Sequence, residues 1–254
     1  CYFLPISSCN VKKRNKVCRS NNNGIIKFSY PKKNLREMWK TRNATMEEHR
    51  LWLIQYMMRP KQEVRRRLGI FLREEAPQVG TPCSWIHVRR GDAMLEYNAE
   101  NPVYLRYFYP LSEYLKKGNI PKGSEVLLLT DDELAIDEAR YLHPDYNWKY
   151  FNKTRNRGST DYNSHIPSKD ETLEMMTLLA EIKLAGHCTK GVFGTSNTNL
   201  FFQMAMTMQH GYKNYEAIKV DNNLKKRTRV EADDFVKDIE AKLEKARRSS
   251  IETL

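Results

Sequence analysis

The sequence has no long hydrophobic run. No stretch approaches the roughly 18 consecutive apolar residues that a membrane-spanning helix needs. Residue 1 is not methionine, and no basic, apolar leader opens the chain. No internal repeat is visible. We therefore expect the sequence to be a piece of a longer protein, excised from a larger chain.

Metal-ligand spacing is also missing. The 5 cysteines include no C-x-x-C pair, and no histidine stands at ligand spacing from them, which argues against a structural zinc site. Cys1, Cys9 and Cys18 cluster in a polar stretch and could form a disulfide in a secreted protein. An odd number of cysteines leaves one unpaired or its partner elsewhere, so the sequence leaves the pairing open.

Negative charge is in deficit. The 43 Lys and Arg against 31 Asp and Glu give a net charge of +12, which favours anionic partners such as nucleic acid, membrane surfaces or phosphorylated small molecules. Charge alone does not choose among them. Much of the excess lies in short runs that we interpret as solvated faces, at 12–14, 65–67, 225–227 and 247–248.

The apolar content is sufficient for a folded core. Hydrophobic residues make up 40% of the 254 residues and aromatic residues 11%. Enough apolar surface is available to offset the entropy of ordering the chain. The sequence therefore predicts a globular protein with one large or two modest domains.

The first 80 residues predict two helices after an irregular start. Residues 1–44 are rich in Asn, Ser, Lys and Pro, with one short strand expected at 25–28. A capping box at 45–48 (TMEE) predicts a helix that ends near Met58. Pro60 suits the first turn of a second helix, and 76–80 (APQVG) reads as a linker. We predict a domain boundary at this linker.

Beyond the linker, short apolar runs alternate with helical patterns. The expected strands are 84–88, 126–129, 148–151 and 191–194, and the expected helices are 103–117, 133–142 and 171–186. This alternation predicts an α/β fold with a Rossmann-like, doubly wound parallel sheet covered by helices. Ligands of such sheets bind at the carboxyl ends of the strands. Regularity weakens after about Tyr215.

The chain ends in a highly charged helical pattern at 230–248. Phe235, Ile239, Leu243 and Ala246 form a narrow apolar stripe on it. We interpret this segment as a docking or terminal helix rather than a membrane or partner helix. The predicted domains are therefore 1–78, part of a first α/β domain; 79–222, the Rossmann-like domain; and 223–254, the charged helix.

The residues best suited to chemistry lie at 86–92 (IHVRRGD). They end the first strand of the alternating region, where the sheet presents its ligand. Two adjacent arginines there place charge at the binding edge, and the planar fork of a guanidinium suits the oxygens of a phosphate. The alternative is that Arg89 and Arg90 form structural ion pairs with Asp92 or Asp132.

A His-x-Arg-Arg-x-Asp pattern after an apolar strand resembles the signature of the α1,6-fucosyltransferases, which include rhizobial nodulation enzymes and N-glycan core fucosyltransferases. The agreement covers roughly residues 1–215 and is most specific from Trp85 to Met208. Its further parts are 3–7 (FLPIS), 56–60 (YMMRP), 129–132 (LTDD) with 138–139 (EA) and 144–146 (PDY), and 181–197. The glycine-rich segment of the family's first domain has no counterpart before residue 80.

The resemblance implies a GT-B-like glycosyltransferase with GDP-fucose as donor. His87 and Glu181, which stands where the family has Asp, would recognise guanine. Arg89 and Arg90 would hold the diphosphate, whose charge grows as the glycosidic bond breaks. The remaining donor-site residues implied are Asp131, Asp132, Ser196 and Asn197, the last two of which could instead be an ordinary helix cap.

An inverting transfer needs a base that takes the proton of the acceptor hydroxyl. Glu96 is the candidate that the family pattern suggests, with Glu100 or Asp92 as alternatives. The family is metal-independent, and the adjacent Asp131 and Asp132 do not form a D-x-D pair, so we expect no divalent cation.

The predicted function is transfer of fucose to a glycan hydroxyl, in α1,6 linkage to a GlcNAc of an N-glycan core or a related oligosaccharide. The family and two sequons, at 43–45 and 152–154, point to the Golgi lumen, with a membrane anchor upstream of this chain. The alternatives are a peptide O-fucosyltransferase, a catalytically inactive homologue, and a basic module that binds anionic ligands. Because no nucleic-acid motif is found, nucleic acid is not expected as a partner.

Overall fold

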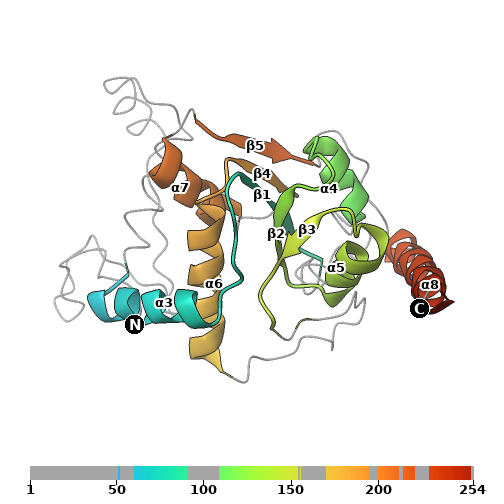
Figure 1. The fold of residues 1–254 in the computed structure, drawn as a ribbon, viewed down its shortest axis with the longest axis horizontal. Helices are drawn as coiled ribbons and strands as arrows, with labels where there is room; N and C mark the ends of the chain where they lie inside the picture. The colour runs from blue at the N-terminus through green and yellow to red at the C-terminus, as the bar shows by residue number, and fades with distance from the viewer. Residues whose placement is uncertain are drawn as a thin grey trace, which may run out of the picture. The chain divides into compact units, whose positions relative to one another are not determined.

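The computed structural model describes most of the second half of the chain and part of the first (Figure 1). The described residues are 51, 60–90, 109–153, 155, 170–194, 199–211, 214–220 and 229–252. The chain divides into two compact units, Cys1–Arg67 and Leu68–Leu254. The strand predicted at 25–28 and the body of the helix predicted to end near Met58 lie outside the described residues, whereas helix α3, Gln62–Glu74, confirms the helix predicted after Pro60.

Five parallel strands form one sheet in the order β3-β2-β1-β4-β5. Their bounds are β1 Cys83–Val88, β2 Glu125–Thr130, β3 Asn147–Lys149, β4 Lys190–Phe193 and β5 Glu216–Lys219. In the register of the sheet, Ile86 lies opposite Leu128 on one side and Val192 on the other. The order reverses at β1, so the topological switch point lies between β1 and β4. The predicted Rossmann-like, doubly wound sheet is confirmed.

Helices cover both faces of this sheet because successive strand residues point to opposite faces and both sets are mostly apolar. They are α4 Leu111–Lys117, α5 Glu133–Asp137 with the π-helical turn η2 Glu138–Leu142, α6 Glu171–Ala185, α7 Asn199–His210 and α8 Arg229–Glu252. Ile86 and Val88 belong to the core that contains residues of α4 and α5. Trp85 and His87 point to the opposite face and pack against Phe202 of α7. Figure 1 shows α6 and α7 on one side of the sheet and α4 and α5 on the other.

Two predicted elements have different bounds in the structure, and one strand was not predicted. The helix expected over 103–117 begins at Leu111, because Pro110 occupies its N-cap position and cannot sit inside a helix. The strand expected at 148–151 is the short edge strand Asn147–Lys149. Strand β5 was missed because its pattern is too short and exposed to distinguish it from a loop.

Helix α8 docks through its apolar stripe. Phe235, Ile239 and Leu243 are buried against Leu134 of α5. Arg247 adds an ion pair, with its Nη2 2.9 Å from Asp137 Oδ2. The interpretation of this segment as a docking helix is confirmed. Among the described helices, none is long and apolar enough to cross a membrane.

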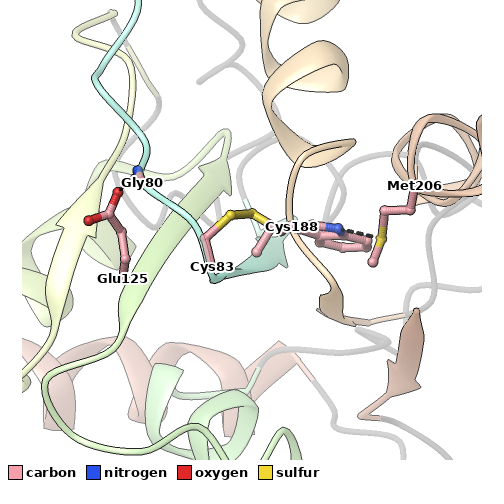
Figure 2. Close-up of a disulfide and its surroundings, with 6 residues drawn as sticks. Gly80, Cys83, Glu125, Cys188 and Met206 are labelled. Carbon is pink, nitrogen blue, oxygen red and sulfur yellow. Dashed lines mark hydrogen bonds between the residues drawn. A yellow bond between two sulfur atoms is a disulfide. The ribbon is translucent and has the colours of Figure 1, made fainter. Parts of the chain in front are cut away.

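A disulfide joins Cys83 at the start of β1 to Cys188 just ahead of β4 (Figure 2). It therefore links the central strand to its neighbour at the amino edge of the sheet, opposite the carboxyl edge at which parallel sheets of this kind bind ligands. Next to it, Trp85 Nε1 donates a hydrogen bond to Met206 Sδ at 2.8 Å, and the backbone amide of Gly80 donates to Glu125. This pairing answers part of the question that the sequence left open.

Candidate functional site

The candidate site lies where β1 and β2 end and where the chain leaves β3. Val88 is the last residue of β1, so Arg89 and Arg90 emerge at the carboxyl edge of the sheet beside the switch point. Asp131 and Asp132 follow Thr130, the last residue of β2. Because adjacent parallel strands end at the same edge, residues 41 positions apart come together there: the Arg90 amide donates to Asp131 Oδ1 at 3.0 Å.

Arg90 is buried in a cage of acceptors. Its Nη2 donates to Glu138 Oε1 at 2.6 Å, its Nη1 donates to the carbonyl of Tyr109 at 3.2 Å, and its Nε lies 2.9 Å from Asp132 Oδ2. Phe235 of α8 covers the guanidinium, 5.9 Å from ring centre to Cζ. Burial disfavours the charge, but the carboxylates of Glu138 and Asp132 outweigh it and raise the pKa of Arg90 above its usual range.

The buried position of Arg90 bears on its predicted contact with a diphosphate. Only 1% of the residue is exposed, and its side chain forms the ion pair with Asp132 that the sequence offered as an alternative. A phosphate would reach this guanidinium only if the cage opened. The geometry favours a role in fixing the strand end, and phosphate contact by Arg90 stays a prediction.

Arg89 has different surroundings. Its side chain is 26% exposed, and its Nη1 lies 4.0 Å from Asp131 Oδ2, a long and partly solvated ion pair. Asp131 itself is 30% exposed, so this pair lies at the surface of the site. Of the two arginines, Arg89 is the one that a ligand at the carboxyl edge can contact directly.

Asp132 has a structural role. It is fully buried, and its Oδ1 accepts from the amide of Leu134 at 3.0 Å, which makes it the N-cap of α5. Its other oxygen faces Arg90. Both oxygens of Asp132 are thus committed within the protein, and Asp131 is the better placed of the two predicted donor-site aspartates.

His87 is held neutral inside the site. It is 7% exposed and packs edge-on against Phe202, with ring centres 5.1 Å apart. Burial, with the nearby charges of Arg89 and Lys153, lowers the pKa of His87 to about 3. A neutral imidazole offers one donor and one acceptor. Its Nδ1 has no hydrogen-bond partner among the described residues, so the ring keeps capacity for a polar ligand.

Glu181 lies on the same side of the sheet, on α6. It is 5% exposed, so it is not a solvated surface acid. Its Oε1 accepts from Lys153 Nζ at 2.7 Å. The charge of Lys153 also lowers the pKa of His87, so an ammonium group, a carboxylate and an imidazole lie close together at this edge.

Arg155 is a residue of the site that the sequence analysis missed. Its Nε donates to the carbonyl of Thr130 at 3.1 Å and its Nη1 to that of Lys153 at 3.0 Å, and its Nη2 donates to the carbonyl of Phe151. The guanidinium thus ties the segment after β3 to the end of β2. Two cations within four residues of the end of the strand predicted at 148–151 were the signal that could have found Lys153 and Arg155.

Five candidate site residues lie outside the described residues. They are the candidate bases Asp92, Glu96 and Glu100, and Ser196 and Asn197 after β4. Next to the latter pair, Asn199 opens α7 and its Nδ2 donates to the carbonyl of Gly194 at 3.3 Å. Gln203, one turn on, donates to Asn199 Oδ1 at 2.9 Å.

The edge as a whole suits an anionic ligand with a polar aromatic base. Arg89 offers an accessible planar cation, and His87, Lys153 and Glu181 offer donors and acceptors in a mostly buried setting. Within the described ranges no group of three or more His, Cys, Asp or Glu could hold a metal ion. A cavity of about 520 Å³ between α4, η2 and α8 contains none of the predicted site residues in its lining.

Comparison with solved structures returns fucosyltransferases. NodZ from Bradyrhizobium matches with a TM-score of 0.37 and 17% identity over 74% of this chain and 53% of that chain. NodZ α1,6-fucosyltransferase soaked with GDP-fucose matches with a TM-score of 0.34 and 16% identity, over 68% of this chain and 56% of that chain. POFUT1 in complex with GDP-fucose matches with a TM-score of 0.35 and 11% identity, over 65% of this chain and 48% of that chain. The chain spans about half the length of these proteins.

No family model matches the sequence, and no curated protein does either. The assignment of the fold rests on the strand order and connectivity described above rather than on these likenesses.

Proposed function

We propose that this chain carries the GDP-sugar site of an inverting fucosyltransferase that uses GDP-fucose. The observation that carries the proposal is the position of Arg89, a partly exposed guanidinium at the end of β1 beside the switch point of the sheet. A nucleoside diphosphate is the ligand class that such an edge binds. The His-x-Arg-Arg-x-Asp pattern, which resembles the α1,6-fucosyltransferases, narrows that class to GDP-fucose.

In this proposal Arg89 stabilises the charge of the leaving GDP. Negative charge accumulates on the diphosphate as the bond to fucose breaks, so a fixed guanidinium contributes more in the transition state than in the ground state. Arg90 acts indirectly, as a positioning residue, because its ion pairs with Glu138 and Asp132 fix the backbone from which Arg89 projects. Ser196 and Asn197 would add hydrogen bonds to the β-phosphate from the end of β4.

The proton of the acceptor hydroxyl would pass to a carboxylate. Glu96 is our candidate for this base, and Glu100 and Asp92 are the alternatives. Inversion follows if the deprotonated hydroxyl attacks the anomeric carbon from the side opposite the leaving GDP. We propose that this transfer needs no divalent cation.

The wider setting of the enzyme is also proposed. The chain would belong to a GT-B-like glycosyltransferase, and the acceptor would be an N-glycan core or a related oligosaccharide in α1,6 linkage. The disulfide between Cys83 and Cys188 supports an oxidising compartment such as the Golgi lumen. Asn152, which begins a sequon, is exposed, as a glycosylated residue must be.

Calorimetric titration of GDP, with and without magnesium, tests the donor site. We expect binding that is independent of magnesium and that Arg89→Ala weakens by about tenfold or more, because a charge-assisted contact to the diphosphate is lost. Arg248→Ala on α8 is the control, since its side chain is 74% exposed and should not affect binding. Binding of CMP as tight as that of GDP would contradict the proposal.

Turnover of GDP-fucose with candidate acceptors then separates the remaining possibilities. Transfer to an oligosaccharide that ends in a core GlcNAc supports the α1,6 assignment, whereas transfer to Ser or Thr of a folded domain supports a peptide O-fucosyltransferase. Binding of GDP without turnover on any acceptor indicates an inactive homologue. Weak, base-independent binding with a steep dependence on salt indicates a basic module for anionic ligands.

A further inference from the structure

Lys153 and Glu181 form a mostly buried ion pair within the proposed donor site. Lys153 Nζ lies 2.7 Å from Glu181 Oε1, and the two side chains are only 21% and 7% exposed. Burying two charges costs free energy that their attraction only partly returns, so such a pair is weak evidence for a purely stabilising role. Its position beside His87 suggests a use in binding.

Hydrogen bonds and helix structure position both members of the pair. Arg155 donates to the carbonyls of Lys153 and Phe151 and at the same time to that of Thr130 at the end of β2. Glu181 comes from the middle of α6, a regular helix capped by Asp170. Both members of the pair are therefore positioned by fixed elements before any ligand arrives, which lowers the cost of ordering them on binding.

The order of polar groups along this pair matches one edge of guanine. Guanine presents an acceptor, O6, followed by two donors, N1–H and the N2 amine, whereas adenine presents a donor where guanine has O6. The pair presents the complement: the donor Nζ of Lys153, then the acceptors Oε1 and Oε2 of Glu181. An ammonium has three N–H donors, and the contact with Glu181 uses one of them.

We infer that Lys153 is a specificity-determining residue that donates to O6 of the guanine while Glu181 accepts from N1–H and N2. This inference rests on the proposed function and extends it from the resemblance-based pair of His87 and Glu181 to a third residue. With adenine in the same place, Nζ would face an amine and Oε1 would face the acceptor N1. Lys153 therefore rejects adenine as well as binding guanine.

The experiment measures dissociation constants of GDP, IDP and ADP for the full chain and for Lys153→Met. IDP keeps O6 and N1–H of guanine but lacks the N2 amine. We expect Lys153→Met to raise the dissociation constants of GDP and IDP by the same factor, about tenfold or more. The dissociation constant of ADP should stay the same or fall. Lys153→Arg, which keeps a donor, should stay within a few-fold of the original protein for GDP.

Lys190→Met is the matched control. Lys190 is 26% exposed and pairs with Glu216 at 3.1 Å, but it lies at the start of β4, at the opposite edge of the sheet. Its replacement removes a comparable ion pair and should leave the constants for all three nucleotides unchanged. If Lys153→Met does not fold, Lys153→Ala, which also lacks a donor, is measured in its place with the same expectation.

The outcomes separate the inference from the proposed function. If the unaltered protein prefers GDP to ADP but Lys153→Met and Lys153→Ala keep the same ratio, the role of Lys153 is wrong and the donor site stands. Equal weakening of all three nucleotides would place Lys153 on the phosphates and also overturn the inference. If the unaltered protein shows no preference for GDP over ADP, the proposed function fails together with it.

Discussion

Arg89 and Arg90 are neighbours in the sequence, yet their guanidinium groups lie in different surroundings. The side chain of Arg90 is inaccessible and faces Glu138 and Asp132, whereas that of Arg89 is 26% exposed beside Asp131. Strand geometry explains the difference, because successive side chains at a strand end point to opposite faces of the sheet. Arg90 therefore belongs to the core and Arg89 to the surface of the candidate site.

This contrast predicts effects of very different size for two alanine substitutions. Arg90→Ala should lower the free energy of unfolding by about 3–5 kcal/mol, because it leaves the buried carboxylates of Glu138 and Asp132 without their cation. Arg89→Ala should change it by less than about 1 kcal/mol, since its ion pair is long and partly exposed. Urea denaturation measures both, and equal losses would refute the assignment.

His87 makes stability depend on pH. Burial, helped by the charges of Arg89 and Lys153, lowers the pKa of His87 in the folded state to about 3. In the unfolded chain the pKa of His87 is about 6.5. Between these two values the unfolded chain binds a proton at His87 and the folded chain does not. Stability is therefore lost as pH falls from about 6.5 towards 3. Between pH 7 and 5, His87 should account for about 2 kcal/mol of this loss.

Denaturation curves of the original protein and His87→Gln at both pH values measure that difference. His143 and His187, whose pKa values burial also lowers, contribute equally to both proteins and cancel. An unchanged loss of stability in His87→Gln would show that another group is responsible.

At the scale of elements, Gly191 is required by its neighbour. A Cβ at this position of β4 would collide with the indole of Trp85 on β1. The indole cannot retreat easily, because Phe193, Phe202 and Met206 surround it. Gly191→Ala should therefore destabilise the protein by roughly 1–3 kcal/mol.

Gly69→Ala in α3 is the control for Gly191→Ala. Apart from the backbone of α3 itself, no atom of the described residues lies within 4 Å of the added carbon at Gly69. Alanine is also the better helix former, so this variant should be as stable as the original or more stable. Thermal melting of the two variants gives the comparison. Equal melting temperatures would mean that β1 and β4 separate to admit a methyl group.

Helix α8 is expected to stabilise the folded unit through a few residues. Leu243 is 1% exposed, and Leu243→Ala should cost about 2–5 kcal/mol because it leaves a cavity against α5 and η2. Lys237, whose side chain is 77% exposed, is the control, and Lys237→Ala should have almost no effect. Similar urea midpoints for the two variants would show that α8 does not pack as described.

The sequence predicts elements well where a strong pattern extends over many residues. Strands β1 and β2 are nearly continuous apolar runs, and α6 has a clear start at Asp170, so all three were found. Strand β5 has one partly buried residue, Ile218, and is held by pairing with β4 rather than by its own pattern. Its existence depends on contacts that no local window of sequence contains.

The site was predictable in part for the same reason. Residues at strand ends, such as Arg89 and Asp131, follow from the strand pattern and the position of binding sites in parallel sheets. The ties made by Arg155 could not be predicted, because they go to backbone carbonyls as far as 25 positions away. Which of two adjacent arginines faces inwards likewise depends on where the carboxylates of α5 and η2 lie in space.

At the scale of the whole molecule, the disulfide between Cys83 and Cys188 closes a long loop. The cysteines are 105 positions apart, so the bond greatly restricts the unfolded chain. The double variant Cys83→Ser, Cys188→Ser should lose roughly 3–5 kcal/mol of stability. Alkylation of the original protein, denatured without reductant, should leave both cysteines unmodified, and modification of both would exclude the disulfide.

The alternation at the end of β1 limits how this part of the chain can change in length. Inserting a single residue between Arg89 and Arg90 would turn Arg90 to the opposite face, so that the carboxylates of Glu138 and Asp132 would lose their cation. A change of two residues would restore the alternation. Viable insertions between the two arginines should therefore occur in even steps.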